Sequence, residues 1–253
     1  MKNKLIPGLV SVTFRQLSPE DIIDITYASG LKAVEWGSDV HLPAGNADTA
    51  EFIRKRSEDT GIVPISYGSY YGKGESGYDM FSKLVNTAKA IGTDNIRIWA
   101  GGKDSGDVSS QERAQYVLEA QKLADIAKEN GIDVSFECHK STLTDTPDSA
   151  LKLIEEIGRD NVYLYWQPLQ SEDIQLNKNI IKRFLPHLKN VHVYAWKGLE
   201  RFALAEHEKA WREYIDVLRQ SEQTRALLLE FVKNDSVEQF KADAYTLLEW
   251  LDK

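Results

Sequence analysis

The segment IDVSFECH, residues 132–139, has the pattern of a short apolar strand that follows Gly131 and ends in polar side chains. Before it, residues 111–130 have the pattern of a helix, and the glycine provides an end for that helix. The same succession of helix, glycine or polar turn, and apolar strand recurs along the whole chain. We therefore predict eight strands and eight helices in alternation.

The predicted strands are short and the helices between them are about 10 to 15 residues long, which requires a parallel sheet with right-handed crossovers. The strands are expected at residues 6–14, 31–36, 62–68, 94–102, 132–139, 161–168, 190–196 and 226–232. Eight such units in 253 residues are typical of a (β/α)8 TIM barrel. A Rossmann fold is disfavoured because no G-x-G-x-x-G turn follows the first strand, and no linker divides the chain, so we predict a single domain over residues 1–253.

Composition narrows the class of function. The chain has 31 Lys and Arg against 39 Asp and Glu, a net charge of −8, and no Lys/Arg block of the kind that binds nucleic acid. No apolar run approaches the ~20 residues that span a bilayer, and the start, MKNKLIPGLV, lacks the pattern of a secretory signal. With one cysteine, Cys138, a cytoplasmic protein that acts on a small molecule is the expectation.

The chemistry is expected where the strands end, because working residues of such barrels lie at the carboxyl ends of the strands. An unpaired carboxylate inside SFECH or LLLEFV would be costly to bury. Glu137, Gln167, His192 and Glu230 stand at corresponding depth on the fifth to eighth strands, and one divalent cation would satisfy all four. The alternative is an ion pair of each carboxylate with a neighbouring cation, for which Arg97 or Lys233 is available.

Aromatic and cationic residues at the other strand ends are candidates for binding a substrate. We expect the rings of Trp36, Trp99 and Trp166 to stack on the faces of a sugar. His41 lies in the SDVHLP loop, where it could contact a substrate as part of a lid.

Arg97 is interpreted either as a counter-charge for Glu137 or as a fork for a substrate carboxylate or phosphate. Lys233 and Lys197 follow the last two strands, but no glycine-rich phosphate cradle accompanies them. An unphosphorylated sugar, polyol or sugar acid is therefore favoured as the substrate.

At these residues the chain resembles the xylose isomerase-like TIM barrel superfamily, and in particular its sugar phosphate isomerase/epimerase branch. The segments that carry the resemblance are VEWGSDVHLP (34–43), SFECHKSTLTDTP (135–147), YLYWQP (163–168), NVHVYAW (190–196) and LLLEFVKND (227–235). In the epimerases of this superfamily Glu, Asp, His and Glu on strands five to eight hold one metal ion. Glu137, His192 and Glu230 match this set, whereas Gln167 stands in the place of the Asp.

The resemblance implies a sugar isomerase or epimerase that depends on one divalent ion, Mn²⁺, Mg²⁺, Co²⁺ or Zn²⁺, and that enolises a ketose through a metal-bound enediolate. It implies that Glu137 and Glu230 exchange a proton with the substrate carbon from opposite sides, assisted by His139. A cyclitol or keto-sugar dehydratase is the alternative enzyme, and Gln167 leaves open a sugar-binding barrel with weakened turnover. The endonuclease IV branch is disfavoured because it needs further His ligands. Relatives are often oligomers, so a homo-oligomer is possible.

Overall fold

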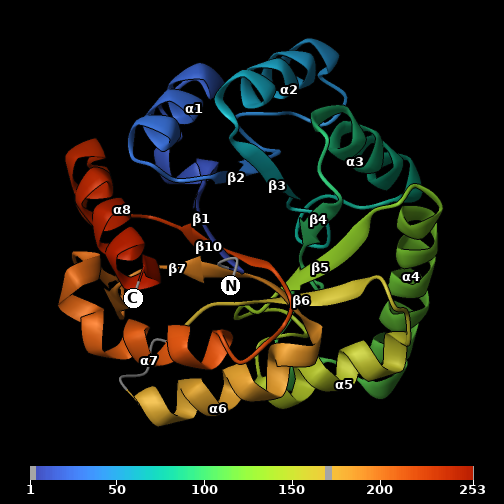
Figure 1. Cartoon of the computed structure of the whole chain (residues 1–253). Helices are drawn as coiled ribbons and strands as arrows, with labels where there is room; N and C mark the ends of the chain where they lie inside the picture. Colours follow the sequence, from blue (N-terminus) through green and yellow to red (C-terminus); the bar gives the residue numbers. More distant parts are fainter. Residues whose placement is uncertain (1–3, 169–172, 253) are drawn as a thin grey trace.

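The chain folds into one closed barrel of eight parallel strands in the order β1-β10-β7-β6-β5-β4-β3-β2, surrounded by helices (Figure 1). The computed structural model describes residues 4–168 and 173–252. The barrel strands are β1 (Leu5–Val10), β2 (Ala33–Gly37), β3 (Val63–Gly68), β4 (Asn95–Ile98), β5 (Asp133–Glu137), β6 (Val162–Trp166), β7 (Leu188–Val193) and β10 (Arg225–Leu229). The predicted single-domain TIM barrel is confirmed.

In the described residues seven α-helices link successive barrel strands and an eighth follows β10, and together they cover the outside of the barrel (Figure 1). They are α1 (Pro19–Ala28), α2 (Ala47–Thr60), α3 (Tyr78–Ile91), α4 (Ser110–Glu129), α5 (Pro147–Ile157), α6 (Ile174–Phe184), α7 (Glu208–Leu218) and α8 (Val237–Asp252). In the described ranges no helix is long and apolar enough to cross a membrane.

Local signals explain where these helices begin and end. Ser18 and Asp21 form a reciprocal capping box at the start of α1, and Ser109 and Glu112 form another at the start of α4. Each box satisfies backbone N–H groups that have no partner within the first turn. Gly61 ends α2 with a left-handed φ of 72°, a conformation that costs glycine little.

Several strands end earlier than the sequence-based prediction, as β4 does at Ile98, and one small hairpin was not predicted. The first strand ends at Val10 and continues as a 3-10 turn, Ser11–Phe14, so the apolar run extends past the sheet. After β7 the chain forms a small antiparallel hairpin of β8 (Trp196–Lys197) and β9 (Glu200–Arg201). Because a two-residue strand has no recognisable periodicity, the sequence pattern could not predict this hairpin.

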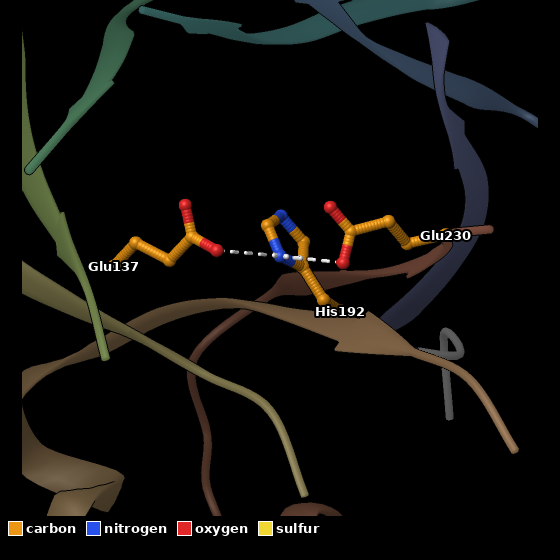
Figure 2. A group of neighbouring side chains, drawn as sticks. All are labelled: Glu137, His192 and Glu230. Carbon is orange, nitrogen blue, oxygen red and sulfur yellow. Dashed lines mark ion pairs between the residues drawn. The ribbon is translucent and has the colours of Figure 1, made fainter. Parts of the chain in front are cut away.

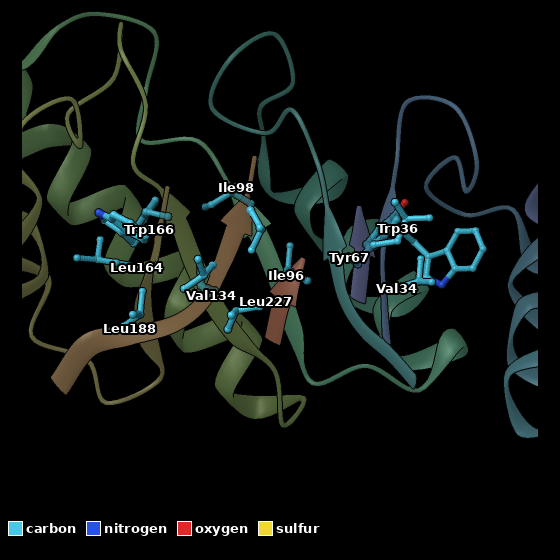
Figure 3. Packing of buried hydrophobic residues seen from close by; sticks show 14 of the residues in the cluster. Val34, Trp36, Tyr67, Ile96, Ile98, Val134, Leu164, Trp166, Leu188 and Leu227 are labelled. Carbon is cyan, nitrogen blue, oxygen red and sulfur yellow. The ribbon is translucent and has the colours of Figure 1, made fainter. Parts of the chain in front are cut away.

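The two faces of the barrel wall carry different residues, because successive side chains of a strand point to opposite sides. Apolar side chains face the helices and form the main core, part of which Figure 3 shows. The polar side chains inside the barrel bond to one another across strands. Asn95 accepts from Ser135 Oγ at 2.6 Å and donates to Ser66 Oγ at 2.9 Å, and Asn190 Nδ2 donates to the Tyr165 hydroxyl at 2.6 Å. This polar layer forms the floor beneath the residues at the mouth.

Candidate metal centre at the barrel mouth

Three potential metal ligands converge at the carboxyl ends of three strands, as Figure 2 shows. Glu137 ends β5, His192 lies near the end of β7, and Glu230 directly follows β10. One ligand atom from each lies within 4.8 Å of the others, and all three residues are buried. Two ligands that each lie about 2.1 Å from one metal are at most about 4.2 Å apart, so the three atoms lie slightly wider than groups around one ion and would have to move inward to hold it.

Gln167, which follows β6, completes the set. Its Nε2 donates to the carbonyl oxygen of Cys138 at 2.9 Å, so its Oε1 is the atom that faces His192. Around His192 Nδ1 lie Gln167 Oε1 at 3.4 Å, Glu230 Oε2 at 3.4 Å and Glu137 Oε1 at 3.8 Å. Three oxygens thus lie within 3.8 Å of one imidazole nitrogen, and together they form a donor set that divalent Mg²⁺, Mn²⁺, Co²⁺ and Zn²⁺ accept.

The buried charge of the site also fits a divalent cation. Burial raises the pKa of Glu230 to about 7, an effect that the nearby His192 opposes. Burial disfavours a charged imidazole at His192, yet the carboxylates of Glu230 and Glu35 outweigh this and raise its pKa to about 9. The raised pKa of His192 reflects an excess of carboxylate charge inside the barrel, whereas the raised pKa of Glu230 is mainly the effect of burial. A divalent ion would neutralise that excess in place of protons.

A second layer of charge lies behind the ligands. Glu35 on β2 is fully buried, and Arg97 on β4 donates to its Oε1 from Nε and Nη2, both at 3.1 Å. Arg97 Nη1 also pairs with Glu137 Oε2 at 2.9 Å. Burial alone would raise the pKa of Glu35, but the guanidinium and His192 lower it to about 2.

Glu35, in the segment VEWGSDVHLP, is a site residue to which the sequence pattern assigned no role. The signal that could have found it is the same one that marked Glu137 and Glu230, a carboxylate inside an otherwise apolar strand.

Arg97 therefore acts as the counter-charge of Glu35 and Glu137. The residue is 6% exposed and each of its three nitrogens contacts one of these two carboxylates, so the alternative, that its guanidinium grips a substrate carboxylate or phosphate, stays a prediction. Glu137 thus forms an ion pair with Arg97 and also belongs to the group of potential metal ligands, so the two alternatives for this carboxylate occur together.

His139 and Trp99 lie next to each other at the mouth. Their ring centroids are 4.5 Å apart, and Tyr70 stacks on the same indole at 6.1 Å. Lys73 Nζ is 4.2 Å from the centre of the Trp99 ring. His139 Nδ1 lies 2.8 Å from the carbonyl oxygen of Lys140. Because a carbonyl can only accept, this contact requires the proton on Nδ1, and Nε2 of the neutral ring is left as an acceptor.

A cavity of about 230 Å³ adjoins these residues. It contacts the metal centre through Gln167, and His139, Lys140 and Tyr194 also line it. Its deeper wall is apolar and is formed in part by Ile180 of α6. A small molecule held there would lie beside the metal ligands.

Other predicted substrate contacts lie elsewhere. Trp36 is fully buried on the helix-facing side of β2, since its neighbour Glu35 points inward, and the prediction that it stacks on a sugar is wrong. Trp166 likewise packs edge-on against Trp211 and Tyr214 of α7, with ring centroids 6.1 and 5.4 Å away, and only borders the cavity.

His41 is 3% exposed and its Nε2 lies 3.3 Å from the carbonyl oxygen of Phe14, so it is a buried loop anchor and no lid contact. Lys233 Nζ lies 3.5 Å from Glu206 Oε1. Its proposed substrate contact stays a prediction.

An eight-stranded parallel barrel with three potential metal ligands at its mouth defines the class to which the chain is assigned. The model of the xylose isomerase-like TIM barrel family matches residues 23–253. The chain therefore belongs to this family, as its sequence segments predicted.

One protein of known activity and two solved structures are similar to this chain. Over 167 residues the chain is 31% identical to a 3-dehydroshikimate dehydratase of Bacillus anthracis, a match that covers 61% of this chain and 59% of that protein. The crystal structure of the probable 3-DHS dehydratase AsbF of the same organism superposes with a TM-score of 0.83 at 22% identity, covering 96% and 98% of the two chains. A xylose isomerase-like barrel protein of Mycobacterium smegmatis in complex with magnesium superposes with a TM-score of 0.72 at 15% identity, covering 97% and 96%.

Proposed function

We propose that the protein is a divalent-metal-dependent enzyme that removes a proton next to the carbonyl group of a small hydroxylated compound and then expels water from it. The observation that carries this proposal is the convergence of Glu137, Gln167, His192 and Glu230 on one point beside a cavity. When bound there, a divalent ion supplies Lewis-acid stabilisation of the charge that develops on a substrate oxygen. The similarity to the dehydratase of Bacillus anthracis supports the same class of reaction.

His139 is the proposed base. Its Nε2 is the acceptor atom of the neutral ring, and the residue lines the cavity beside Gln167. Proton removal breaks a C–H bond, and its electron pair forms the carbon–carbon double bond as the C–O bond to the β-hydroxyl group breaks. The departing hydroxide takes up a proton and leaves as water, so the reaction needs no oxidant or reductant.

The Arg97–Glu137 ion pair favours this reaction over epimerisation. Epimerisation uses two bases on opposite faces of a carbon, and here one of the two candidate carboxylates is held by a guanidinium at 2.9 Å. Elimination needs only one base together with an acid for the leaving group. A sugar isomerase or epimerase remains the second candidate, which the matching family and the two facing glutamates of the metal set favour.

The test uses the full chain loaded with Mn²⁺ and offers 3-dehydroshikimate and a panel of ketoses in D₂O, followed by NMR. Water elimination supports the dehydratase. Solvent deuterium at a ketose carbon without water loss would instead support the isomerase, and neither change in a metal-loaded protein would refute both activities. We expect His139→Gln to lower kcat about 10²- to 10⁴-fold. His187→Gln is the matched control, because His187 precedes β7 at the opposite end of the barrel.

A further inference from the structure

Glu35 does not line the cavity, yet its buried carboxylate contacts both Arg97 and His192. It is fully buried on β2, on the other side of the His192 ring from the oxygens of Gln167, Glu137 and Glu230. Its Oε1 lies 3.5 Å from His192 Nε2, while His192 Nδ1 faces Gln167, Glu137 and Glu230. The two ring nitrogens thus face two different environments, one of ligands and one of a single carboxylate.

Arg97 links Glu35 to the ligand set. Its Nε and Nη2 bond to Glu35, and its Nη1 bonds to Glu137. One guanidinium therefore ties the carboxylate behind His192 to the carboxylate beside it. Since a guanidinium is planar and rigid, moving Glu35 also moves the group that holds Glu137.

Gly68, at the end of β3, gives an independent sign that this pair is built into the barrel. A Cβ at this position would lie 2.5 Å from Arg97 Nη2 and 2.8 Å from Glu35 Oε1. Its φ is outside the left-handed region, so the backbone does not require glycine here. Glycine is needed here because the Arg97–Glu35 ion pair occupies the volume that a Cβ would fill.

From these contacts we infer that Glu35, Arg97 and Gly68 form a positioning layer for the metal centre. With the metal bound, Glu35, whose Oε1 lies 3.5 Å from His192 Nε2, would accept the Nε2–H, which fixes the tautomer and leaves the Nδ1 lone pair for the ion, and Arg97 holds Glu137 in place. Carboxylates in this position behind a histidine ligand are a general means of orienting the ring and raising its affinity for metal. None of these three residues lines the cavity beside Gln167. The inference rests on the metal site of the proposed function.

The experiment compares Mn²⁺ binding to the metal-free protein by calorimetry in the parent and in two variants. We expect Glu35→Gln to weaken Mn²⁺ binding about 10- to 100-fold, because the neutral amide is a poorer acceptor. Gly68→Ala should weaken it in the same direction without removing any polar group. Gly106→Ala is the matched control, since no atom lies within 4 Å of a Cβ at Gly106, and its affinity should equal that of the parent.

A second readout does not depend on any variant. In the parent loaded with diamagnetic Mg²⁺ or Zn²⁺, ¹⁵N NMR should find the His192 proton on Nε2. A proton on Nδ1, or parent-like Mn²⁺ affinity in both folded variants, would overturn the inference while leaving the metal site intact. Failure of the parent itself to bind any of these ions would remove both the inference and the proposed function.

Discussion

Two buried arginines at opposite ends of the barrel have contrasting surroundings. Arg97 ends β4 at the mouth and contacts two buried carboxylates. Arg225 begins β10 at the other end and is 1% exposed, yet its Nη2 contacts only the neutral oxygens of Ser221 and Gln223.

Charge balance explains why the pKa values of these two residues move apart. Burial opposes the charge of both guanidiniums, but Glu137 and Glu35 raise the pKa of Arg97, whereas burial alone lowers the pKa of Arg225 to about 10. Buried charge at the mouth is organised around carboxylates, as a cation site requires. At the opposite end, the buried Arg225 makes no ion pair with a carboxylate of residues 4–168 or 173–252.

The largest effect is expected from Arg97→Met, which leaves Glu35 and Glu137 without their shared cation. In the metal-free protein we expect a loss of about 3–5 kcal/mol in the free energy of unfolding, measured by urea titration, because an uncompensated buried charge remains. Arg159→Met is the control, since Arg159 pairs with Asp125 on the surface and should cost less than about 1 kcal/mol. Equal losses in the two variants would contradict the assignment of Arg97.

Metal binding should stabilise the mouth. At a Mn²⁺ concentration 100 times the dissociation constant, we expect the free energy of unfolding to rise by about 2.7 kcal/mol, because the ion binds only the folded chain. Arg225→Met should show the same gain, whereas His192→Ala should show none. A gain that survives His192→Ala would place the ion elsewhere.

A smaller change, in the affinity for Mn²⁺, is expected when Gln167 is replaced. In the parent, Glu137 and Glu230 just balance the charge of a divalent ion, and an aspartate would add one negative charge. Gln167→Asp should therefore tighten Mn²⁺ binding about tenfold in calorimetry, since affinity rises with ligand charge. The exposed Gln220→Asp adds the same charge at the end of α7 and should change nothing. Tighter binding by the parent than by Gln167→Asp would defeat this account.

The smallest effect is expected from Arg225→Met. The side chain has no carboxylate to leave behind, and the oxygens that it bonds can turn to water, because Gln223 is exposed. Replacing a poorly compensated buried charge by an apolar chain of similar length should change the free energy of unfolding by less than about 1 kcal/mol. A loss of stability as large as that of Arg97→Met, measured by the same urea titration, would show that Arg225 is as important for folding as the paired Arg97 and would contradict this account.

Sequence patterns located the three potential metal ligands because the strand ends of a parallel barrel share one rim. Glu137, His192 and Glu230 could be assigned from their places in apolar strands, and the structure brings them within 4.8 Å. Trp36 was assigned to the wrong side of the wall. A shift of one position along a strand reverses the direction of a side chain, and in β2 the inward residue is Glu35.

Local signals along the chain were enough to determine the fold of this protein. Glycine ends such as Gly61, helix caps such as Ser18, and the spacing of apolar residues act over a few positions, so they can be recognised without knowledge of distant partners. Tertiary structure alone decided that Arg97 lies between Glu35 and Glu137, and that the amide of Gln167 turns its oxygen toward His192. These contacts join strands that are 25 to 62 residues apart in the chain, and only the closure of the barrel determines the distances between their side chains.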